Sequence, residues 1–354
     1  MVLEYKPDLE RAKTCWRAYW EGEIIDRPIV CVRAPKAGSA PVVPPRYMDG
    51  VYGDFADAVG RYDQYAKNTV FAGESLPNMP ISFGPDQFAL FIGGDFTVSD
   101  ETATSWIHPY VESWRDTSFA LDTVAGSLYN RMLEFIREAR RQGKDKFLIS
   151  MIDLHSAMDC LSAMRGPQNL CFDLYDCPED VEEANNKARA LYRPVYDALF
   201  AAGEMEITGS IGWMPLYYEG KFAVVQCDFM GLIGNADAKK LVMPALEEES
   251  AYLDRCILHL DGKDALRHLD DILAIERINA IQWVPGDGQP KTYEWMELLQ
   301  TIQRAGKGLY LYDWSVEAIH AHYKELRPEG LVFDLEAKTE GESEALLKWM
   351  KENT

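Results

Sequence analysis

The sequence lacks an excess of positive charge and lacks any long apolar run. Its 354 residues include 36 Lys and Arg against 57 Asp and Glu, a net charge of −21. Such a charge repels a nucleic acid backbone and an anionic membrane surface, so neither is expected as a partner. No apolar run approaches the ~20 residues that a membrane-spanning helix needs, so no membrane partner is expected on this ground either.

Paired cysteine motifs are also missing. The seven cysteines are odd in number and form no CxxC pair. The N-terminal segment is charged and amphipathic rather than uniformly apolar, unlike a secretory signal. Together these features predict a cytoplasmic protein with reduced thiols.

The sequence does contain a regular alternation of apolar runs and amphipathic segments. This alternation predicts an α/β fold with a parallel sheet. The count of eight runs predicts a (β/α)8 TIM-type barrel formed by one domain over 1–354, with an N-terminal helical extension at 1–25 and an insertion at 75–120 over the barrel mouth. A doubly wound open sheet is the alternative, which the absence of a GxGxxG segment disfavours. The eight runs are 28–34, 68–72, 146–154, 222–229, 255–261, 279–285, 308–313 and 330–335.

Ionisable residues follow the predicted strands where a barrel enzyme carries its site. His259 and Asp261 are two residues apart, so both side chains of this strand end face one side, and Gly262 follows them. With Asp228 they are the candidate catalytic residues. A neutral imidazole and carboxylates can bind zinc or another divalent ion, so the candidate metal ligands are His259, Asp261, Cys227 and Glu336. Without a metal, His259 and Asp261 would hydrogen-bond each other or orient a substrate.

A second group of residues has the chemistry to bind a small-molecule substrate. Arg33 ends the first predicted strand and can pair with a carboxylate, although a structural ion pair would use it equally well. The remaining candidates are His155, at the end of the third strand, and Trp106, Trp213 and Trp283, whose rings either stack on a substrate or pack in the core. The sequence contains no HExxH, GxSxG or SxxK motif, so it does not support nucleophilic catalysis by serine or cysteine.

At these segments the chain resembles the uroporphyrinogen decarboxylase superfamily, which includes corrinoid- and coenzyme M-linked methyltransferases. The likeness is carried by Pro28–Arg33, by Ser150–Arg165, by Gln226–Gly234 and most specifically by Ile257–Gly262. The last segment is similar to the His-x-Cys-Gly zinc motif of the methyltransferases, with Asp261 where they have cysteine. The resemblance implies a barrel, a metal site and a corrinoid protein as methyl acceptor.

Several functions therefore remain open. The first is a methyltransferase-like enzyme that acts on a small substrate, with zinc or another divalent metal and a partner corrinoid protein. The second is a carboxylate-based hydrolase or lyase for a sugar-like or aromatic glycoside, because paired acids and aromatic walls suit that chemistry. A cofactor-free decarboxylase and a non-catalytic binding barrel are further alternatives.

Overall fold

The computed structural model describes every residue except 1, 40–41, 44, 46–47 and 100–103. Its main feature is a seven-stranded sheet in the order β2-β1-β13-β12-β11-β10-β9, and all neighbours in it are parallel except β2 and β1. The strands are β1 (Ile29–Pro35), β2 (Thr69–Gly73), β9 (Phe222–Gln226), β10 (Arg255–Asp261), β11 (Ala280–Val284), β12 (Gly308–Leu311) and β13 (Leu331–Glu336).

The second predicted strand, at 68–72, runs in the opposite direction from the one expected. It forms β2, which pairs antiparallel with β1 in a register that places Thr69 beside Pro35. Helix α2 (Phe55–Lys67) ends one residue before Asn68, so the chain leaves this helix at the carboxyl end of β1 and returns along it. The run at 68–72 is therefore an antiparallel edge rather than a parallel barrel strand.

Short strands occupy the other side of the molecule. Strands β3 (Asn78–Met79) and β6 (Leu148–Ile149) pair in parallel, and a parallel bridge joins Ser150 to Ile211 in β7 (Ser210–Ile211). Strand β7 also pairs with β8 (Tyr217–Tyr218) and lies beside β9. The pairings in the described part of the chain do not by themselves close the sheet into a barrel.

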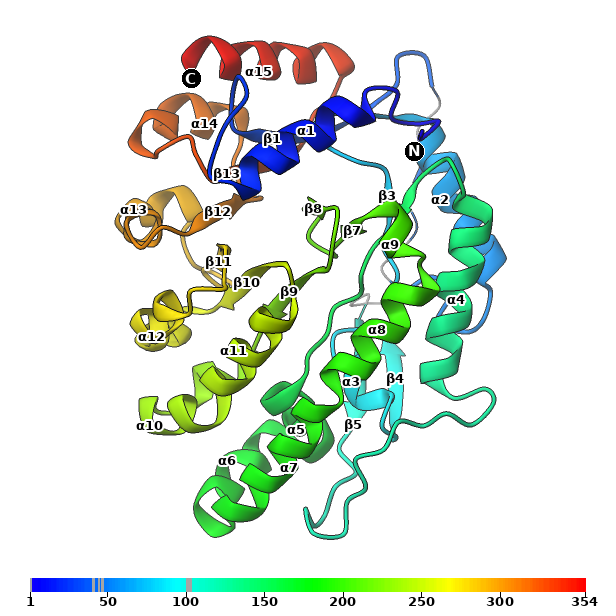
Figure 1. Ribbon diagram of the computed structural model, residues 1–354, viewed down its shortest axis with the longest axis vertical. Helices are drawn as coiled ribbons and strands as arrows, with labels where there is room; N and C mark the ends of the chain where they lie inside the picture. The colour runs from blue at the N-terminus through cyan, green and yellow to red at the C-terminus, as the bar shows by residue number, and fades with distance from the viewer. Residues whose placement is uncertain (1, 40–41, 44, 46–47, 100–103) are drawn as a thin grey trace.

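Helices stand on the outer side of these strands. Figure 1 shows α11–α15 on one side of the molecule and α2, α4 and α8 on the other. Each strand from β9 to β13 is followed by at least one helix. The further helices are α4 (Leu128–Gly143), α5 (Ala157–Arg165), α6 (Pro167–Asp176), α7 (Pro178–Ala190), α8 (Tyr192–Ala202), α9 (Met205–Thr208), α10 (Asn235–Asp237), α11 (Met243–Tyr252), α12 (Leu269–Ala274), α13 (Met296–Arg304), α14 (Val316–His322) and α15 (Glu340–Asn353).

The amphipathic segment 178–202 forms two helices, α7 and α8, which meet at Leu191. Pro194 explains the break, because its ring lacks an N–H and collides with the carbonyl of Ala190 in a continuous helix.

The segment expected as an insertion, 75–120, contains β3, the short helix α3 (Gln87–Leu90) and an antiparallel hairpin of β4 (Asp95–Ser99) and β5 (Thr104–His108). Residues 100–103 of that hairpin lie outside the described residues.

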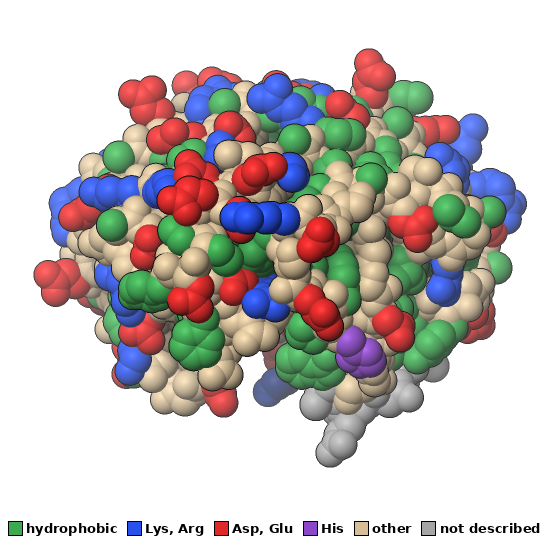
Figure 2. All heavy atoms as spheres, turned by 90° about the horizontal axis from the view of Figure 1, so that it is seen from below, with side chains coloured by type: hydrophobic (Ala, Val, Ile, Leu, Met, Phe, Trp, Pro, Cys, Tyr) green, Lys and Arg blue, Asp and Glu red, His purple; other side chains and the backbone are tan. Residues whose placement is uncertain are grey.

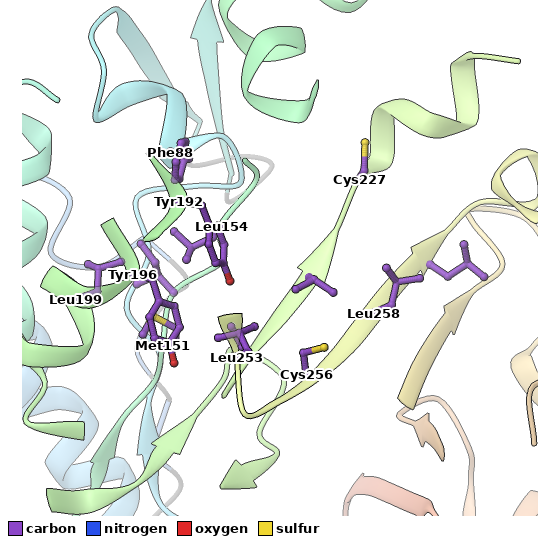
Figure 3. Packing of buried hydrophobic residues seen from close by; sticks show 14 of the residues in the cluster. Phe88, Met151, Leu154, Tyr192, Tyr196, Leu199, Cys227, Leu253, Cys256 and Leu258 are labelled. Atoms are coloured by element: carbon purple, nitrogen blue, oxygen red, sulfur yellow. The ribbon is translucent and has the colours of Figure 1, made fainter. Parts of the chain in front are cut away.

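Two hydrophobic clusters follow from the alternation along the strands. Side chains on one face of the strands pack against the outer helices in one large cluster, and Figure 3 labels some of its members, among them Leu258 of β10 and Leu199 of α8. Side chains on the other face form a second cluster with helix α1 (Leu9–Trp20), which includes Ile257 of β10, Val224 of β9 and Trp16 of α1. The helix expected within 1–25 is thus α1, which covers one end of the inner cluster. It is held there in part by Trp20, whose Nε1 donates a hydrogen bond to the carbonyl of Tyr217 at 2.7 Å.

The acidic excess is distributed rather than gathered in one patch on the face seen in Figure 2, where basic side chains lie between the acidic ones. Exposed ion pairs such as Arg17 with Glu219 at 2.5 Å join parts of the chain that are distant in sequence. None of the helices in the described part of the chain has the length and apolar character needed to cross a bilayer.

Candidate functional site

A cavity of about 520 Å³ lies at the carboxyl ends of the parallel strands. Its lining residues continue the inward face of the strands beyond the inner cluster: His259 follows Ile257, and Asp334 follows Val332. The cavity is therefore built by strand alternation, with apolar residues below and polar residues above. It is lined by Arg33, Trp213, Met214, His259, Gln282, Val284, Tyr310, Tyr312, Asp334, Leu335 and Glu336.

Three side chains next to this cavity could hold a metal ion. One nitrogen of His259 and one oxygen each of Asp228 and Asp261 lie within 4.8 Å of one another. Asp228 is exposed, while the other two side chains are half-buried. At Gly262 the backbone has φ of +78°, which glycine adopts without strain, so the chain can turn directly after Asp261. The cluster shares His259 with the cavity wall.

The orientation of His259 is fixed from two sides. Its Nδ1 lies 2.5 Å from Gln282 Oε1, and its ring meets the ring of Trp213 edge-on at 5.4 Å between centroids. Because an amide oxygen only accepts, this contact requires the proton on Nδ1, and in the neutral ring the lone pair is then on Nε2. A histidine that binds a metal uses this arrangement, in which one nitrogen is held by a hydrogen bond and the other is free.

A buried charge network supports Asp228 from behind. The carboxylate of Asp159, in α5, accepts hydrogen bonds from the backbone N–H groups of Asp228 at 3.0 Å and Phe229 at 2.8 Å. His155 lies between Asp153 (3.1 Å) and Asp159 (3.5 Å). Burial alone would lower the pKa of His155, but the two carboxylates overcome this and raise it to about 10. His155 is consequently an imidazolium at neutral pH.

Although part of Asp228 reaches solvent, its carboxyl group is surrounded by protein; this desolvation, reinforced by the nearby Asp159 carboxylate, raises the pKa of Asp228 to about 6, while His155 and His259 oppose the shift. Burial also raises the pKa of Asp86, and the nearby carboxylates of Asp159 and Asp153 add to this shift. A further buried acid lies behind α5: the Ser156 hydroxyl donates to Glu249 of α11. Burial raises the pKa of Glu249 to about 8.

The structure brings together six of the residues selected from the sequence. Arg33, Trp213, His259 and Glu336 line the cavity, and Asp228 and Asp261 form the potential metal site with His259. Arg33 donates to Asp334 at 2.6 Å and lies 3.8 Å from Glu336, so its charge is already paired. His155 is buried behind the site and does not line the cavity.

Other selected residues lie away from the site. Trp283 follows the inward-facing Gln282 by one residue, so its side chain points to the outer face of β11. There it is buried, and its ring centroid lies 5.3 Å from that of Trp295. Trp106 is 59% exposed on the β4–β5 hairpin and does not line the cavity.

Two of the four predicted metal ligands, Cys227 and Glu336, lie outside the cluster of Asp228, His259 and Asp261. Cys227 is packed in the outer hydrophobic cluster (Figure 3), where its thiol points to Asp159 at 3.6 Å and burial raises its pKa. Strand β9 ends at Gln226 and a 3₁₀ turn begins at Asp228, so strand alternation no longer applies and Asp228 takes the place expected for Cys227. Glu336 stands at the rim, with its side chain 77% exposed and outside the cluster.

Sequence reasoning missed several polar residues of the site. Gln226 and Gln282 sit at the same level as His259 on the two neighbouring strands, since His259 pairs in register with both. Tyr310 of β12 and Tyr312, which follows the end of β12, also line the cavity. The sequence does contain one signal for Gln226 and Gln282: each is a polar residue at an inward-facing position of an otherwise apolar strand.

The chain matches no protein-family model and no curated protein sequence. Its fold is similar to that of one solved enzyme. A solved methyltransferase from Methanosarcina mazei superimposes with a TM-score of 0.62, covering 97% of this chain and 98% of that one. The two sequences are 13% identical, so the likeness establishes the shared α/β architecture and leaves the chemistry to be argued from the site.

Proposed function

We propose that this chain is a methyltransferase-like enzyme that binds a small substrate at a divalent metal ion. The observation that carries the proposal is the Asp228, His259 and Asp261 cluster, which adjoins the 520 Å³ cavity at the strand ends. In a fold shared over its whole length with a methyltransferase, this is the place where a barrel enzyme has its site. Membership of the uroporphyrinogen decarboxylase superfamily, inferred from the sequence, belongs to the same proposal.

The proposal includes closure of the strands into a barrel. The inner cluster supports it, because it joins residues of β1, β6, β7 and β9–β13 around the side chains of α1. Packing of one continuous core between strands on opposite sides of the molecule is the expected interior of a barrel. Strands β6 and β7, joined by the bridge from Ser150 to Ile211, would complete the circuit between β3 and β9.

The donor set suits a borderline or hard divalent ion. One imidazole nitrogen and two carboxylate oxygens are ligands for zinc, and they leave a fourth position open for substrate, as in catalytic zinc sites. When bound, such an ion supplies Lewis acidity toward a polar group of the substrate. The thiolate that the methyltransferase motif provides is absent here, since Asp261 replaces it and Cys227 points elsewhere.

The residues of this chain would prepare the reaction rather than form a covalent intermediate. Gln282 holds the His259 ring, and Asp159 holds the backbone turn that presents Asp228. Trp213 and Tyr310 shape the wall of the cavity around the substrate. A reduced corrinoid on a partner protein would supply the nucleophile that accepts the methyl group, and the residues of this chain would hold the methylated substrate in place for it.

The hydrolase, lyase and decarboxylase alternatives have less support in the geometry. The nearest carboxylate oxygens of Asp228 and Asp261 lie within 4.8 Å of one another and of His259, a convergence on one point in space. Inverting glycosidases instead keep their two carboxyl groups about 6.5–9.5 Å apart, which leaves room for the attacking water. A decarboxylase without cofactor needs a free cation for the carboxylate, whereas Arg33 is paired with Asp334.

A methyl-transfer assay tests the proposal. The full chain, loaded with zinc, is incubated with cob(I)alamin as acceptor and a panel of methylated amines, thiols and ethers, and methylcobalamin is followed by its absorbance. We expect transfer from at least one donor, loss with a chelator and loss in His259→Ala. Cleavage of a glycoside panel with no methyl transfer would overturn the proposal in favour of the hydrolase.

A further inference from the structure

The cavity carries more negative than positive charge even in its wall. Asp334 and Glu336 line it, and Arg33 is the one Lys or Arg among its described lining residues. The Arg33 guanidinium donates to Asp334 at 2.6 Å, while Glu336 stands 3.8 Å away with its side chain 77% exposed. A divalent ion at Asp228 and Asp261 would balance those two acids only. The wall would still hold two carboxylates against one guanidinium, so a cation is favoured there over an anion.

Aromatic rings face the same space. Tyr310 and Tyr312 lie with their rings nearly parallel, 14° apart with centroids at 6.5 Å. Tyr310 is buried and donates to Asp334 at 2.5 Å, so its ring is fixed, whereas Tyr312 remains 38% exposed. Burial raises the pKa of Tyr312 to about 12, and a neutral phenol ring results. Trp213 lies against His259 and thereby joins the aromatic wall to the potential metal site.

We propose that the cavity selects a methylated onium cation, such as a quaternary ammonium group, on a small molecule that also carries a metal-binding oxygen. The proposal rests on the proposed function for the transfer step, but not for the binding. Aromatic faces attract such a cation within ~6 Å, and a quaternary nitrogen has no N–H that would need an acceptor. The hydroxyl or carboxylate of the same molecule would reach the cluster of Asp228, His259 and Asp261 past Trp213.

The chemistry of an onium donor fits this wall. The electron pair of the reduced corrinoid forms the bond to the methyl carbon, the carbon–nitrogen bond breaks, and its pair stays on nitrogen. The leaving group is a neutral amine, so no proton has to be supplied. The positive charge that the wall of Tyr310, Tyr312 and Glu336 attracts is removed in this step, which weakens the binding of the product relative to the donor.

Calorimetric titration of the full, zinc-loaded chain with two matched probes tests the selection. Choline carries a quaternary nitrogen and a hydroxyl; 3,3-dimethylbutan-1-ol has the same shape with a neutral carbon in place of nitrogen. We expect choline to bind at least about tenfold more tightly. Tyr312→Leu and Glu336→Gln should each reduce that preference severalfold and leave the affinity for the alcohol nearly unchanged. Tyr175→Leu, at a side chain 87% exposed in α6, is the matched control and should leave both affinities unchanged.

Equal binding of the two probes, or tighter binding of the anion 3,3-dimethylbutyrate, would overturn the inference. The methyl-transfer assay separates this outcome from failure of the proposed function. Selective choline binding with no methyl transfer from any donor keeps the onium site and removes the methyltransferase. Methyl transfer from neutral donors alone, without preferential binding of choline, would keep the methyltransferase and remove the onium site.

Discussion

The carboxylate of Asp159 accepts a hydrogen bond from the backbone N–H of Asp228 at 3.0 Å. It thereby joins α5 to the turn that begins where β9 ends, across 69 residues of sequence. The same carboxylate accepts from Phe229 and lies 3.5 Å from the imidazole of His155. The position of one potential metal ligand thus depends on a buried acid that does not belong to the ligand set.

Replacement of Asp159 by Ala should weaken metal binding without removing a ligand. The backbone N–H groups of Asp228 and Phe229 would lose their acceptor, and the turn would no longer be held. Loss of such supporting contacts typically costs about 10–100-fold in metal affinity. Competition with a chromogenic zinc chelator measures the change, and Asp116→Ala, at an exposed loop position, is the control. Unchanged affinity in Asp159→Ala would show that the turn is held by other contacts.

Glu249 should make the protein less stable as the pH rises. An unfolded glutamate titrates near 4.5, whereas the pKa of Glu249 in the fold is about 8 because the carboxyl is buried. Between these values the folded state holds a proton that the unfolded state has released. Unfolding then releases that proton, so the free energy of unfolding falls with rising pH up to about 8 and is level beyond it.

Glu249→Gln keeps an acceptor for the Ser156 hydroxyl and removes the titration. We expect the variant to match the parent near pH 5 and to be more stable by ~2–4 kcal/mol near pH 8, measured by urea unfolding at each pH. Glu248→Gln, at the neighbouring exposed ion pair with Arg189, should show no such gain. Parallel stability profiles for Glu249→Gln and the parent would mean that Glu249 is ionised in the folded protein.

The buried ion pair of Arg27 with Glu74 should be required for the start of β1. The two contacts measure 2.5 and 2.9 Å, and Glu74 also accepts from the backbone N–H of Val30 at 3.0 Å. Arg27→Met leaves the Glu74 charge buried without its partner, which should cost ~3–5 kcal/mol of unfolding free energy. Arg141→Met, which breaks an exposed pair with Glu138, should cost less than ~1 kcal/mol in the same denaturation experiment. Similar losses in the two variants would contradict this role.

Strand periodicity was sufficient to predict where His259 and Asp261 point. Both lie in a strand that keeps its regular geometry to its last residue, so alternation holds through the motif. The same rule predicts the packing of Trp283 against the helices rather than in the cavity, once Gln282 is known to face inward. The site residues at Gln282 and Gln226 were missed because their importance depends on the register between strands, which the sequence of one chain does not contain.

Periodicity failed where the backbone changed its conformation. Cys227 was expected as a metal ligand, but β9 ends at Gln226 and the 3₁₀ turn that follows places Asp228 in the cluster instead. The direction of β2 was wrong for a similar reason: apolar composition identifies a strand but not the path by which the chain enters it. The alternation of strands and helices from β9 to β13, by contrast, followed directly from the apolar and amphipathic spacing of the sequence.

Metal content of the full chain and its ligand variants tests the central claim most directly. After removal of bound metal, reloading with zinc and gel filtration, elemental analysis should find about one ion per chain in the parent protein. The same stoichiometry should persist in Cys227→Ala and Glu336→Gln, whose side chains lie outside the cluster of Asp228, His259 and Asp261. It should be lost in His259→Ala. A parent protein that retains no zinc, or a His259→Ala variant that retains as much as the parent, would contradict the account.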